Sequence, residues 1–420
     1  MHPVKREAIA LCGDGALTPA GTQHLTRAPY LQSTTTRTTT VAWGAREATG
    51  EVVLRKPGES EIVARAPAKK ANLEQPRNDI QVVKAELSGL EPTYLYCYQV
   101  VANGVALTAP APLSTAAAPA RKDPIRFIAL GDSGTGGKAQ RALMKRISEV
   151  PFDFMLLMGD IAYESGTATQ LEKRFFAVYR DYLRYVPAYP AIGNHERRTQ
   201  QGRPYFDAFV LPGNERYYSF DWGDVHIVAI DTTQREADQL RWLDADLARN
   251  KLPWVIVFGH HPPYTSSFRG PQKAVRRAFA KILTQHEVDL VVSGHEHHYE
   301  RFRIAGVNYI ISGGGGARLN AFWGNTGALK QAAKHHFLAF EATATSLKMR
   351  VVGIDGEEIE TLALEKGEAP KVDDKPEHEQ TPLPAEKKIE SDPTIHDGPD
   401  DDVHKPTLPE QTGTQPITQN

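Results

Sequence analysis

Five short apolar runs in this chain end in the same way. Each run stops at a glycine, and the glycine is followed at once by an aspartate, an asparagine or a histidine. The five pairs are Gly131-Asp132, Gly159-Asp160, Gly193-Asn194, Gly259-His260 and Gly294-His295. A single Gly-Asp pair is more often a turn or a helix cap than a ligand. Five such endings, all carrying oxygen or nitrogen donors, predict a shared site for metal ions.

Two further donors lie close to these pairs. Tyr163 follows Asp160 by three positions, and His297 follows His295 by two. Seven donors exceed what one ordinary metal site uses, and one bridging carboxylate would bring the number of metal contacts to eight. That is enough for two metal ions with positions left for water and substrate. The candidate ligands are Asp132, Asp160, Tyr163, Asn194, His260, His295 and His297.

The elements that must position these donors are the strands of an α/β domain. From Ile125 to about Leu364, apolar runs of strand length alternate with helical patterns. Continuous apolar strands indicate sheets that are buried on both faces. In such sheets ligands collect at the carboxyl ends of the strands. Two helical faces are expected in this region. One consists of Leu240, Leu243 and Leu247, and the other of Val275, Phe279, Ile282 and His286.

The rest of the chain divides into three regions that differ in amino-acid composition and periodicity. Residues 1–25 carry no periodic signal, and we expect them to be mobile. Residues 26–118 are rich in Thr and Val in short alternating stretches, which predicts an all-β sandwich, with a linker at 114–124. We place the α/β domain at 123–365. Residues 366–420 are acidic and rich in Pro, cannot form a core, and are predicted to be disordered.

Composition excludes several classes of protein. The 420 residues are 40% hydrophobic and carry a formal net charge of −2, so no global field attracts nucleic acid or an anionic membrane. No apolar run approaches the ~18 residues of a membrane span. The two cysteines, Cys12 and Cys97, are too few for a disulfide framework or a cysteine zinc site, and they leave the redox compartment open. The N-terminus shows no convincing signal peptide.

The motif series identifies a family. The order GD…GDxxY…GNHE…GHxP…GHxH over residues 131–297 resembles the calcineurin-like metallophosphoesterase superfamily. Tyr163 and the ending His297-His298-Tyr299-Glu300-Arg301 narrow the resemblance to purple acid phosphatases. Those enzymes often carry an N-terminal sandwich, and LSGLEPTYLYCYQV with Trp43 resembles the fibronectin type III or Ig-like pattern. The implied architecture is that sandwich followed by two packed β-sheets flanked by helices.

The resemblance also implies a dinuclear centre. A trivalent iron site would use Asp132, Asp160, Tyr163 and His297. A divalent site, holding Zn²⁺, Mn²⁺ or Fe²⁺, would use Asp160, Asn194, His260 and His295, with Asp160 bridging. The implied reaction is hydrolysis of a small phosphate monoester, in which metal-bound hydroxide attacks phosphorus in line and His195 assists the leaving group. Secretion or a periplasmic location is implied as well.

Some residues around the motifs are less settled. Family members of the plant and mammalian type place a further histidine after GHxP, whereas Tyr264–Gly270 here reads YTSSFRG. Arg269 is a candidate for phosphate binding in its place, and His261 is a further candidate for substrate binding. His298 should face outward, and Glu296 should not be a ligand. Gly313–Gly316 either let the backbone pass close to the metals or form a flexible loop.

Two other functions fit the same residues. The motifs fix the metals and not the ester, so a phosphodiesterase or nucleotide pyrophosphatase is one alternative. The other is a non-enzymatic adhesion or binding protein with a structural metal site. The intact ligand set and the pair Asn194-His195 argue against the latter. The oligomeric state, the divalent ion and the physiological ester do not follow from the sequence.

Overall fold

The N-terminal part of the chain is a sandwich of two β-sheets. The computed structural model describes residues 3–47, 49–71 and 81–366. Its first sheet has the order β1-β2-β6-β5, and its second has the order β4-β3-β7-β8 with β9 paired to β7. Inward-facing side chains of both sheets, among them Trp43, Leu54 and Tyr98, form one core. The strands are β1 (Leu25–Gln32), β2 (Thr39–Ala45), β3 (Glu51–Arg55), β4 (Ile62–Pro67), β5 (Lys69–Lys70), β6 (Gln81–Leu87), β7 (Leu95–Ala102), β8 (Val105–Ala106) and β9 (Ala111–Ser114).

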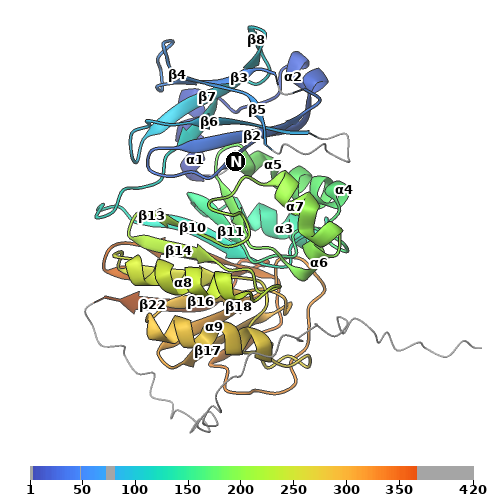
Figure 1. Cartoon of the computed structure of the whole chain (residues 1–420), viewed down its shortest axis with the longest axis vertical. Coiled ribbons are helices and arrows are strands. Elements are labelled where there is room, and N and C mark those ends of the chain that lie inside the picture. The colour runs from blue at the N-terminus through green and yellow to red at the C-terminus, as the bar shows by residue number, and fades with distance from the viewer. Residues whose placement is uncertain (1–2, 48, 72–80, 367–420) are drawn as a thin grey trace, which may run out of the picture. The chain divides into compact units, whose positions relative to one another are not determined.

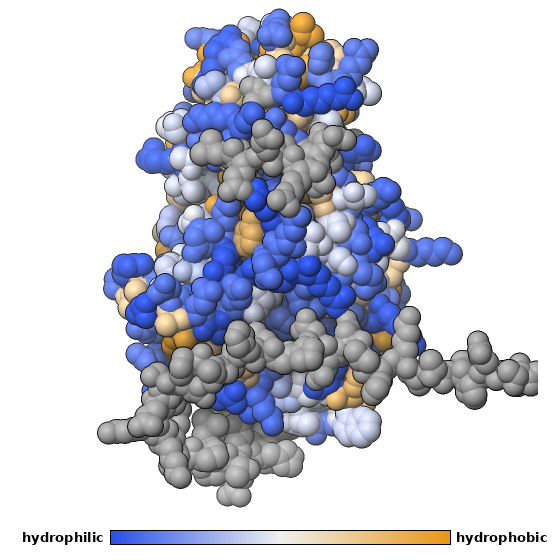
Figure 2. Space-filling model, turned by 45° about the vertical axis from the view of Figure 1, so that its right-hand side comes forward, coloured by the Kyte–Doolittle hydropathy of each residue, from blue (hydrophilic) through white to orange (hydrophobic). Residues whose placement is uncertain are grey.

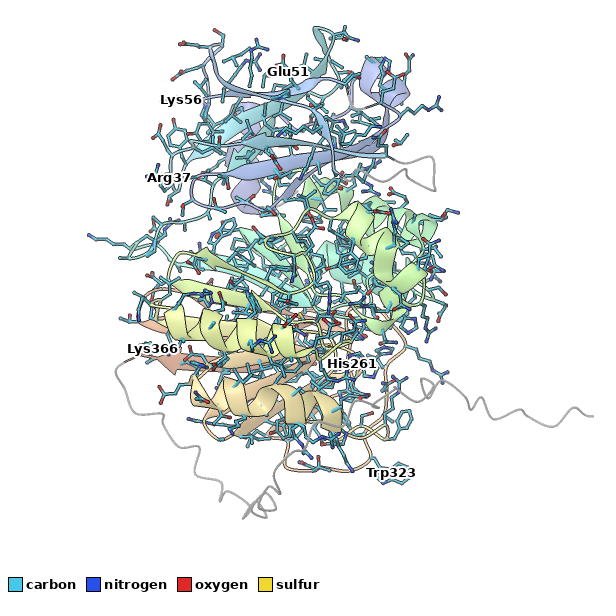
Figure 3. All side chains as sticks on the ribbon, viewed as in Figure 1. Arg37, Glu51, Lys56, His261, Trp323 and Lys366 are labelled. Atoms are coloured by element: carbon cyan, nitrogen blue, oxygen red, sulfur yellow. A yellow bond between two sulfur atoms is a disulfide. The ribbon has the colours of Figure 1, made fainter. Side chains whose placement is uncertain are left out.

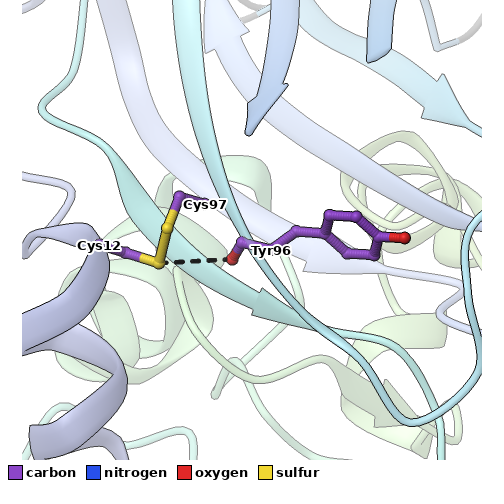
Figure 4. Close-up of a disulfide and its surroundings, with 3 residues drawn as sticks. All are labelled: Cys12, Tyr96 and Cys97. Carbon is purple, nitrogen blue, oxygen red and sulfur yellow. Dashed lines mark hydrogen bonds between the residues drawn. A yellow bond between two sulfur atoms is a disulfide. The ribbon is translucent and has the colours of Figure 1, made fainter. Parts of the chain in front are cut away.

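The segment before the sandwich differs from our expectation of a mobile N-terminus. It forms α1 (Pro3–Cys12) and α2 (Pro19–His24), and α2 is capped by Thr18, whose hydroxyl accepts the N–H of Gly21 at 3.0 Å. A disulfide joins Cys12 at the end of α1 to Cys97 in β7, with Cα atoms 5.2 Å apart (Figure 4). Helix α1 was missed because its ten residues carry no cap or periodic signal, and the disulfide adds a covalent anchor to the packing of Ala8.

The α/β domain contains two further sheets. The six-stranded sheet has the order β12-β11-β10-β20-β21-β22, and the seven-stranded sheet has the order β13-β14-β15-β16-β18-β17-β19. Strands β10, β11 and β12 run parallel, as do β14, β15, β16 and β18. The strands are β10 (Ile125–Leu130), β11 (Phe154–Leu157), β12 (Ala188–Pro190), β13 (Tyr218–Trp222), β14 (Val225–Ala229), β15 (Trp254–Phe258), β16 (Leu290–Ser293), β17 (Tyr299–Ile304), β18 (Val307–Ser312), β19 (Lys330–Ala332), β20 (His336–Ala342), β21 (Ser346–Gly353) and β22 (Glu358–Glu365).

The two sheets pack face to face between layers of helices, as the alternation of side chains along a strand dictates. In β15, Ile256 and Phe258 enter the core shared with the six-stranded sheet, whereas Val255 and Val257 pack with residues of α8 and α9 on the other face. Helices α8 and α9 are seen next to β16 and β18 in Figure 1. The predicted α/β class with sheets and helices is therefore confirmed. The helices are α3 (Lys138–Ile147), α4 (Ala168–Leu171), the π-helical η1 (Glu172–Phe176), α5 (Ala177–Leu183), α6 (Asn194–Arg197), the 3₁₀ turn η2 (Gln200–Gly202), α7 (Arg203–Ala208), α8 (Ala237–Arg249) and α9 (Lys273–Gln285).

Polar contacts fix the sandwich to the α/β domain through β1. Arg27 Nε donates to Glu172 Oε1 at 2.7 Å, and the guanidinium lies 3.7 Å from the centre of the Phe176 ring. Gln32 Nε2 donates to the carbonyl of Ala188 in β12 at 3.1 Å. Since Ala188 begins the strand that leads to Asn194, the sandwich braces the six-stranded sheet.

The face of the molecule shown in Figure 2 is largely hydrophilic. Hydrophobic residues on this face are scattered among hydrophilic ones. Trp323, 80% exposed, projects from the lower edge of the domain in Figure 3. None of the helices in the described residues has the length and hydropathy to cross a membrane. The predicted disordered tail lies, from residue 367 onward, outside the described residues.

Candidate metal centre

The oxygen donors lie at the carboxyl ends of three parallel strands. Asp132 follows β10, Asp160 and Tyr163 follow β11, and Asn194 follows β12 and begins α6. The backbones of Asp132 and Asp160 have φ values of 58° and 51°. This left-handed conformation is costly for a residue with a side chain, and it persists only where the surroundings enforce it. Such turns are typical of functional sites.

The nitrogen donors lie at the ends of two strands of the other sheet. His260 follows β15, and His295 and His297 follow β16. The ring of His260 is fully buried, and its Nδ1 lies 2.7 Å from the carbonyl oxygen of Met158, next to β11. His297 Nδ1 lies 2.7 Å from the carbonyl oxygen of Arg318. Donation from Nδ1 to these carbonyls leaves Nε2 of both rings as the free ligand atom.

One group of donors gathers around Tyr163. The Tyr163 hydroxyl lies 3.0 Å from Asp132 Oδ1 and 3.1 Å from His297 Nε2. His297 Nε2 in turn lies 3.4 Å from Asp132 Oδ1. A carboxylate, a phenol and an imidazole from three different turns therefore point at one spot.

A second group gathers around His260. Its Nε2 lies 2.9 Å from Asn194 Oδ1, 3.3 Å from Asp160 Oδ2 and 3.3 Å from His295 Nδ1. Ligand atoms of Asp132, Asp160 and His260 also lie within 4.8 Å of one another. Asp160 thus stands between the two groups, where a bridging carboxylate would have to be.

Charges in the site are strongly coupled. Burial opposes ionisation of Asp160, but His260 and His195 outweigh it and hold the pKa of Asp160 below its usual range. Burial likewise disfavours the charged form of His260, yet Asp160 raises its pKa to about 10. Burial and then the Asp132 and Asp160 carboxylates raise the pKa of Tyr163 well above its ordinary value. Buried anions held against protonated partners are what a cation replaces when it binds.

His195 lies beside this site and not in either group. Its backbone N–H donates to Asp160 Oδ1 at 3.1 Å, and its Nδ1 lies 2.6 Å from the carbonyl oxygen of Glu164. Nε2 lies 3.8 Å from Asp160 Oδ2, and 13% of the side chain is exposed. The ring edge that carries Nε2 is therefore turned toward the donors while remaining open to a substrate.

The two remaining candidates differ in how they relate to the site. The His261 ring lies 4.5 Å from the His295 ring, its Nδ1 is 3.0 Å from the Thr232 hydroxyl, and Figure 3 shows it within the body of the domain. Arg269 is exposed in the loop after GHxP. Burial, then His261 and His260, lower the pKa of His295, and the charge of Arg269 acts in the same direction. The positive charge of Arg269 therefore acts electrostatically on His295.

His298 is buried, so the expectation that it faces outward was wrong, and Glu296 beside it is buried as well. His298 Nε2 lies 3.0 Å from Glu300 Oε2, and Glu300 also accepts the hydroxyl of Thr265 at 2.7 Å. The error came from treating 295–298 as extended. His295 has a φ of 68°, and the segment is a turn before β17, so side chains do not alternate there.

The glycine run after β18 approaches the site closely. A Cβ at Gly313 would lie 2.2 Å from the carbonyl oxygen of Glu296 and 2.7 Å from Asp132 Oδ2. Gly315 donates its N–H to the carbonyl of Gly131 at 3.0 Å. Of the two interpretations of this run, the close approach of backbone is the one observed.

Sequence reasoning missed one residue of the centre. Glu196, fully buried, accepts the backbone N–H groups of Asp160, Ala162 and Gly193. Burial and then Asp160 raise its pKa to about 7. The available signal was its place as the third residue of α6, where a glutamate often caps the helix.

Comparison with known proteins agrees with this geometry. Residues 125–299 match the family model described as calcineurin-like phosphoesterase. The chain is 30% identical over 269 residues to purple acid phosphatase 21 of Arabidopsis thaliana, covering 57% of this chain and 60% of that protein. It is 28% identical over 272 residues to an uncharacterised protein of Mycobacterium tuberculosis, covering 53% of this chain and 51% of that protein. The chain therefore spans about half to three-fifths of the length of these relatives.

A solved structure shows the same fold. The purple acid phosphatase from yellow lupin seeds superimposes with a TM-score of 0.71 at 19% identity, over 80% of this chain and 74% of that one. Residues 125–299 thus match the calcineurin-like phosphoesterase family. The chain is related to the purple acid phosphatases, which confirms the family predicted from the motifs.

Proposed function

We propose that this protein is a dinuclear-metal phosphatase that hydrolyses small phosphate monoesters. The observation that carries the proposal is the convergence of seven oxygen and nitrogen donors in two groups with Asp160 between them. The family match independently supports a phosphoric-ester hydrolase. The sandwich, which we assign to the fibronectin III-like class, braces the domain and contributes no donor to the site.

The two groups of donors suit different metal ions. The group of Asp132, Tyr163 and His297, with Asp160, suits Fe³⁺, because burial keeps Tyr163 protonated unless a highly charged cation binds the oxygen. The group of Asn194, His260 and His295, with Asp160, suits Zn²⁺, Mn²⁺ or Fe²⁺. When bound, such a metal pair polarises phosphate oxygens and supplies a water-derived nucleophile near neutral pH.

The chain's own residues then act on the ester. With Nδ1 held by the Glu164 carbonyl, His195 presents Nε2 to the ester and gives its proton to the departing oxygen. His261 lies beside His295, where it would contact a phosphate oxygen. Arg269 adds a fixed positive charge on the same side, which attracts the anionic substrate.

A disulfide between residues 12 and 97 supports a secreted or periplasmic location, since such bonds persist in oxidising compartments.

Two esters test the reaction. We expect p-nitrophenyl phosphate to be hydrolysed faster than bis-p-nitrophenyl phosphate, because a monoester leaves more oxygens for the metals. Asn194→Ala should lower turnover of both, whereas Asp153→Asn, at the opposite end of β11, should leave it unchanged. Faster cleavage of the diester would move the phosphodiesterase alternative ahead. Absence of hydrolysis by metal-loaded protein would favour the binding-protein alternative.

The role of His195 has its own test. If it protonates the leaving oxygen, His195→Ala should slow phenyl phosphate by about 10²–10⁴-fold and p-nitrophenyl phosphate much less, since p-nitrophenolate departs without a proton. Equal losses on the two esters would show that His195 binds phosphate and does not donate a proton.

A further inference from the structure

Glu196 occupies an unusual position for a buried carboxylate. Its side chain is fully buried, yet within the described residues no arginine or lysine is paired with it. Its Oε2 accepts the N–H of Asp160 at 2.8 Å and that of Gly193 at 3.0 Å, and its Oε1 accepts the N–H of Ala162 at 3.0 Å. Three backbone N–H groups favour the carboxylate form, which burial disfavours.

These donors belong to two different turns of the candidate metal centre. Asp160 and Ala162 lie in the turn after β11, which also carries Tyr163. Gly193 lies in the turn after β12 and directly precedes Asn194 and His195. The two turns touch closely, because a Cβ at Gly193 would lie 2.2 Å from Asp160 Oδ1. Glu196 therefore ties together the backbones of the bridging ligand and of the second-site ligand.

The hydrogen bonds accepted by Glu196 do more than cap helix α6. Only the bond to Gly193 belongs to the cap of α6, which is four residues long. The other two bonds cross to another strand and hold Asp160 in the left-handed conformation, at a φ of 51°. Such a conformation costs roughly 1–3 kcal/mol and relaxes when its support is removed.

We propose that Glu196 is a positioning residue that sets the spacing between Asp160 and the Asn194-His195 pair, and through it the affinity for both metals. This inference rests on the proposed dinuclear centre. Glu196 does not itself ligate, since both carboxylate oxygens are occupied by backbone N–H groups. Its removal should therefore weaken metal binding without removing a ligand.

The test is Glu196→Gln, in which one carboxylate oxygen becomes an amide that cannot accept. The matched control is Asp153→Asn, because Asp153 Oδ2 accepts the N–H of Arg126 at 3.0 Å between β10 and β11, at the far end of the same sheet. The measurements are Zn²⁺ titration of chelator-stripped protein and the melting temperature with and without metal. Outer partners of metal ligands typically change affinity 10–100-fold, and we expect that loss at both sites in Glu196→Gln.

The melting temperatures separate positioning from packing. A purely structural residue lowers the melting temperature of stripped and loaded protein alike, as expected for Asp153→Asn. Glu196→Gln should instead shrink the gap between the two, because weaker binding gives less stabilisation. A gap and a Zn²⁺ affinity equal to those of the wild type would overturn the inference.

Glu196→Asp covers the case in which Glu196→Gln does not fold. It keeps the charge but retracts the oxygens by one methylene, so its metal affinity should lie below that of the wild type. Wild-type affinity in Glu196→Asp would overturn the inference. Wild-type protein that binds no metal would overturn the proposed function instead, so the two failures are distinguishable.

Discussion

The two sheets of the α/β domain contribute different chemistry to one site. The six-stranded sheet supplies only oxygen donors, namely Asp132, Asp160, Tyr163 and Asn194. The seven-stranded sheet supplies only imidazoles, namely His260, His295 and His297. Neither sheet alone presents the complete ligand set that we propose for either metal. The site therefore exists only when both sheets are packed together.

The two sets of donors are also held in different ways. Asp160 on the oxygen side is fixed through its backbone, by Glu196 and by a strained φ. On the imidazole side, His260 and His297 are fixed through their rings, by carbonyls that accept from Nδ1. A carboxylate side chain is short, so its direction depends on the backbone conformation. An imidazole is longer, and a hydrogen bond from its second nitrogen fixes the orientation of the ring.

The largest effect should come from replacing Asp160, the ligand that we propose serves both metals. Asp160→Asn should reduce metal content from about two ions per chain toward none and lower turnover by about 10³-fold or more, since several kcal/mol of charge stabilisation are lost. Elemental analysis and an ester assay check this. A stoichiometry unchanged at two would show that Asp160 does not bridge.

The next change removes one oxygen and keeps the ring. Tyr163→Phe should abolish the pink-to-violet colour expected of an Fe³⁺–phenolate and loosen iron, while the fold survives because the ring still packs against His195 at 4.5 Å. Turnover should fall only in part, since three other donors remain. Colour is read from a visible spectrum and iron from elemental analysis. Wild-type protein that is colourless with Fe³⁺ bound would remove Tyr163 from the ligands.

A third change lies outside both sheets and should leave the site intact. Replacing Cys12 and Cys97 together by serine should lower the free energy of unfolding of the sandwich by about 2–4 kcal/mol. Metal content and turnover should stay at wild-type values. Chemical denaturation and metal analysis check the two halves of this expectation. Loss of metal in the double variant would mean that the sandwich supports the site through β1.

The smallest effect concerns a histidine on the seven-stranded sheet away from the metals. Burial opposes protonation of His226, but Asp221 and Asp246, at 2.7 and 3.0 Å, raise its pKa to about 9. Its stabilisation is therefore complete below the unfolded pKa near 6.5 and is lost as the pH rises through about 9. The melting temperature of His226→Gln should fall less than that of the wild type over this range. Parallel curves for the two proteins would refute the prediction.

The strands of the α/β domain and the donors that follow them could be predicted from the sequence. Strands such as β10 and β15 carry unbroken apolar runs, and the residues after them had to meet at a sheet edge. The division of the donors into two metal sites followed from the family resemblance, whereas their division between the two sheets was not predicted. Which atoms approach one another, as Tyr163 and His297 do at 3.1 Å, required the structure.

The misses have different causes. His298 was misjudged because it lies in a turn with the left-handed residue His295, which does not follow strand periodicity. Glu196 was missed because its role depends on contacts with the turn after β11, although its capping position in α6 was a local signal. The disulfide at Cys12 was missed because two cysteines in a chain carry no pattern. A covalent bond between positions 85 residues apart is set by the tertiary fold, which local sequence does not encode.

The donors are far apart in the sequence, so they are synthesised at different times. Asp132 and His297 are 297 − 132 = 165 positions apart. At roughly 5–20 residues per second, a ribosome needs on the order of 10–30 s to pass from one to the other. During that interval the nascent chain offers carboxylates and a phenol without the imidazoles that complete either site. On the proposed assignment, neither metal site can be completed before His295 and His297 have been synthesised.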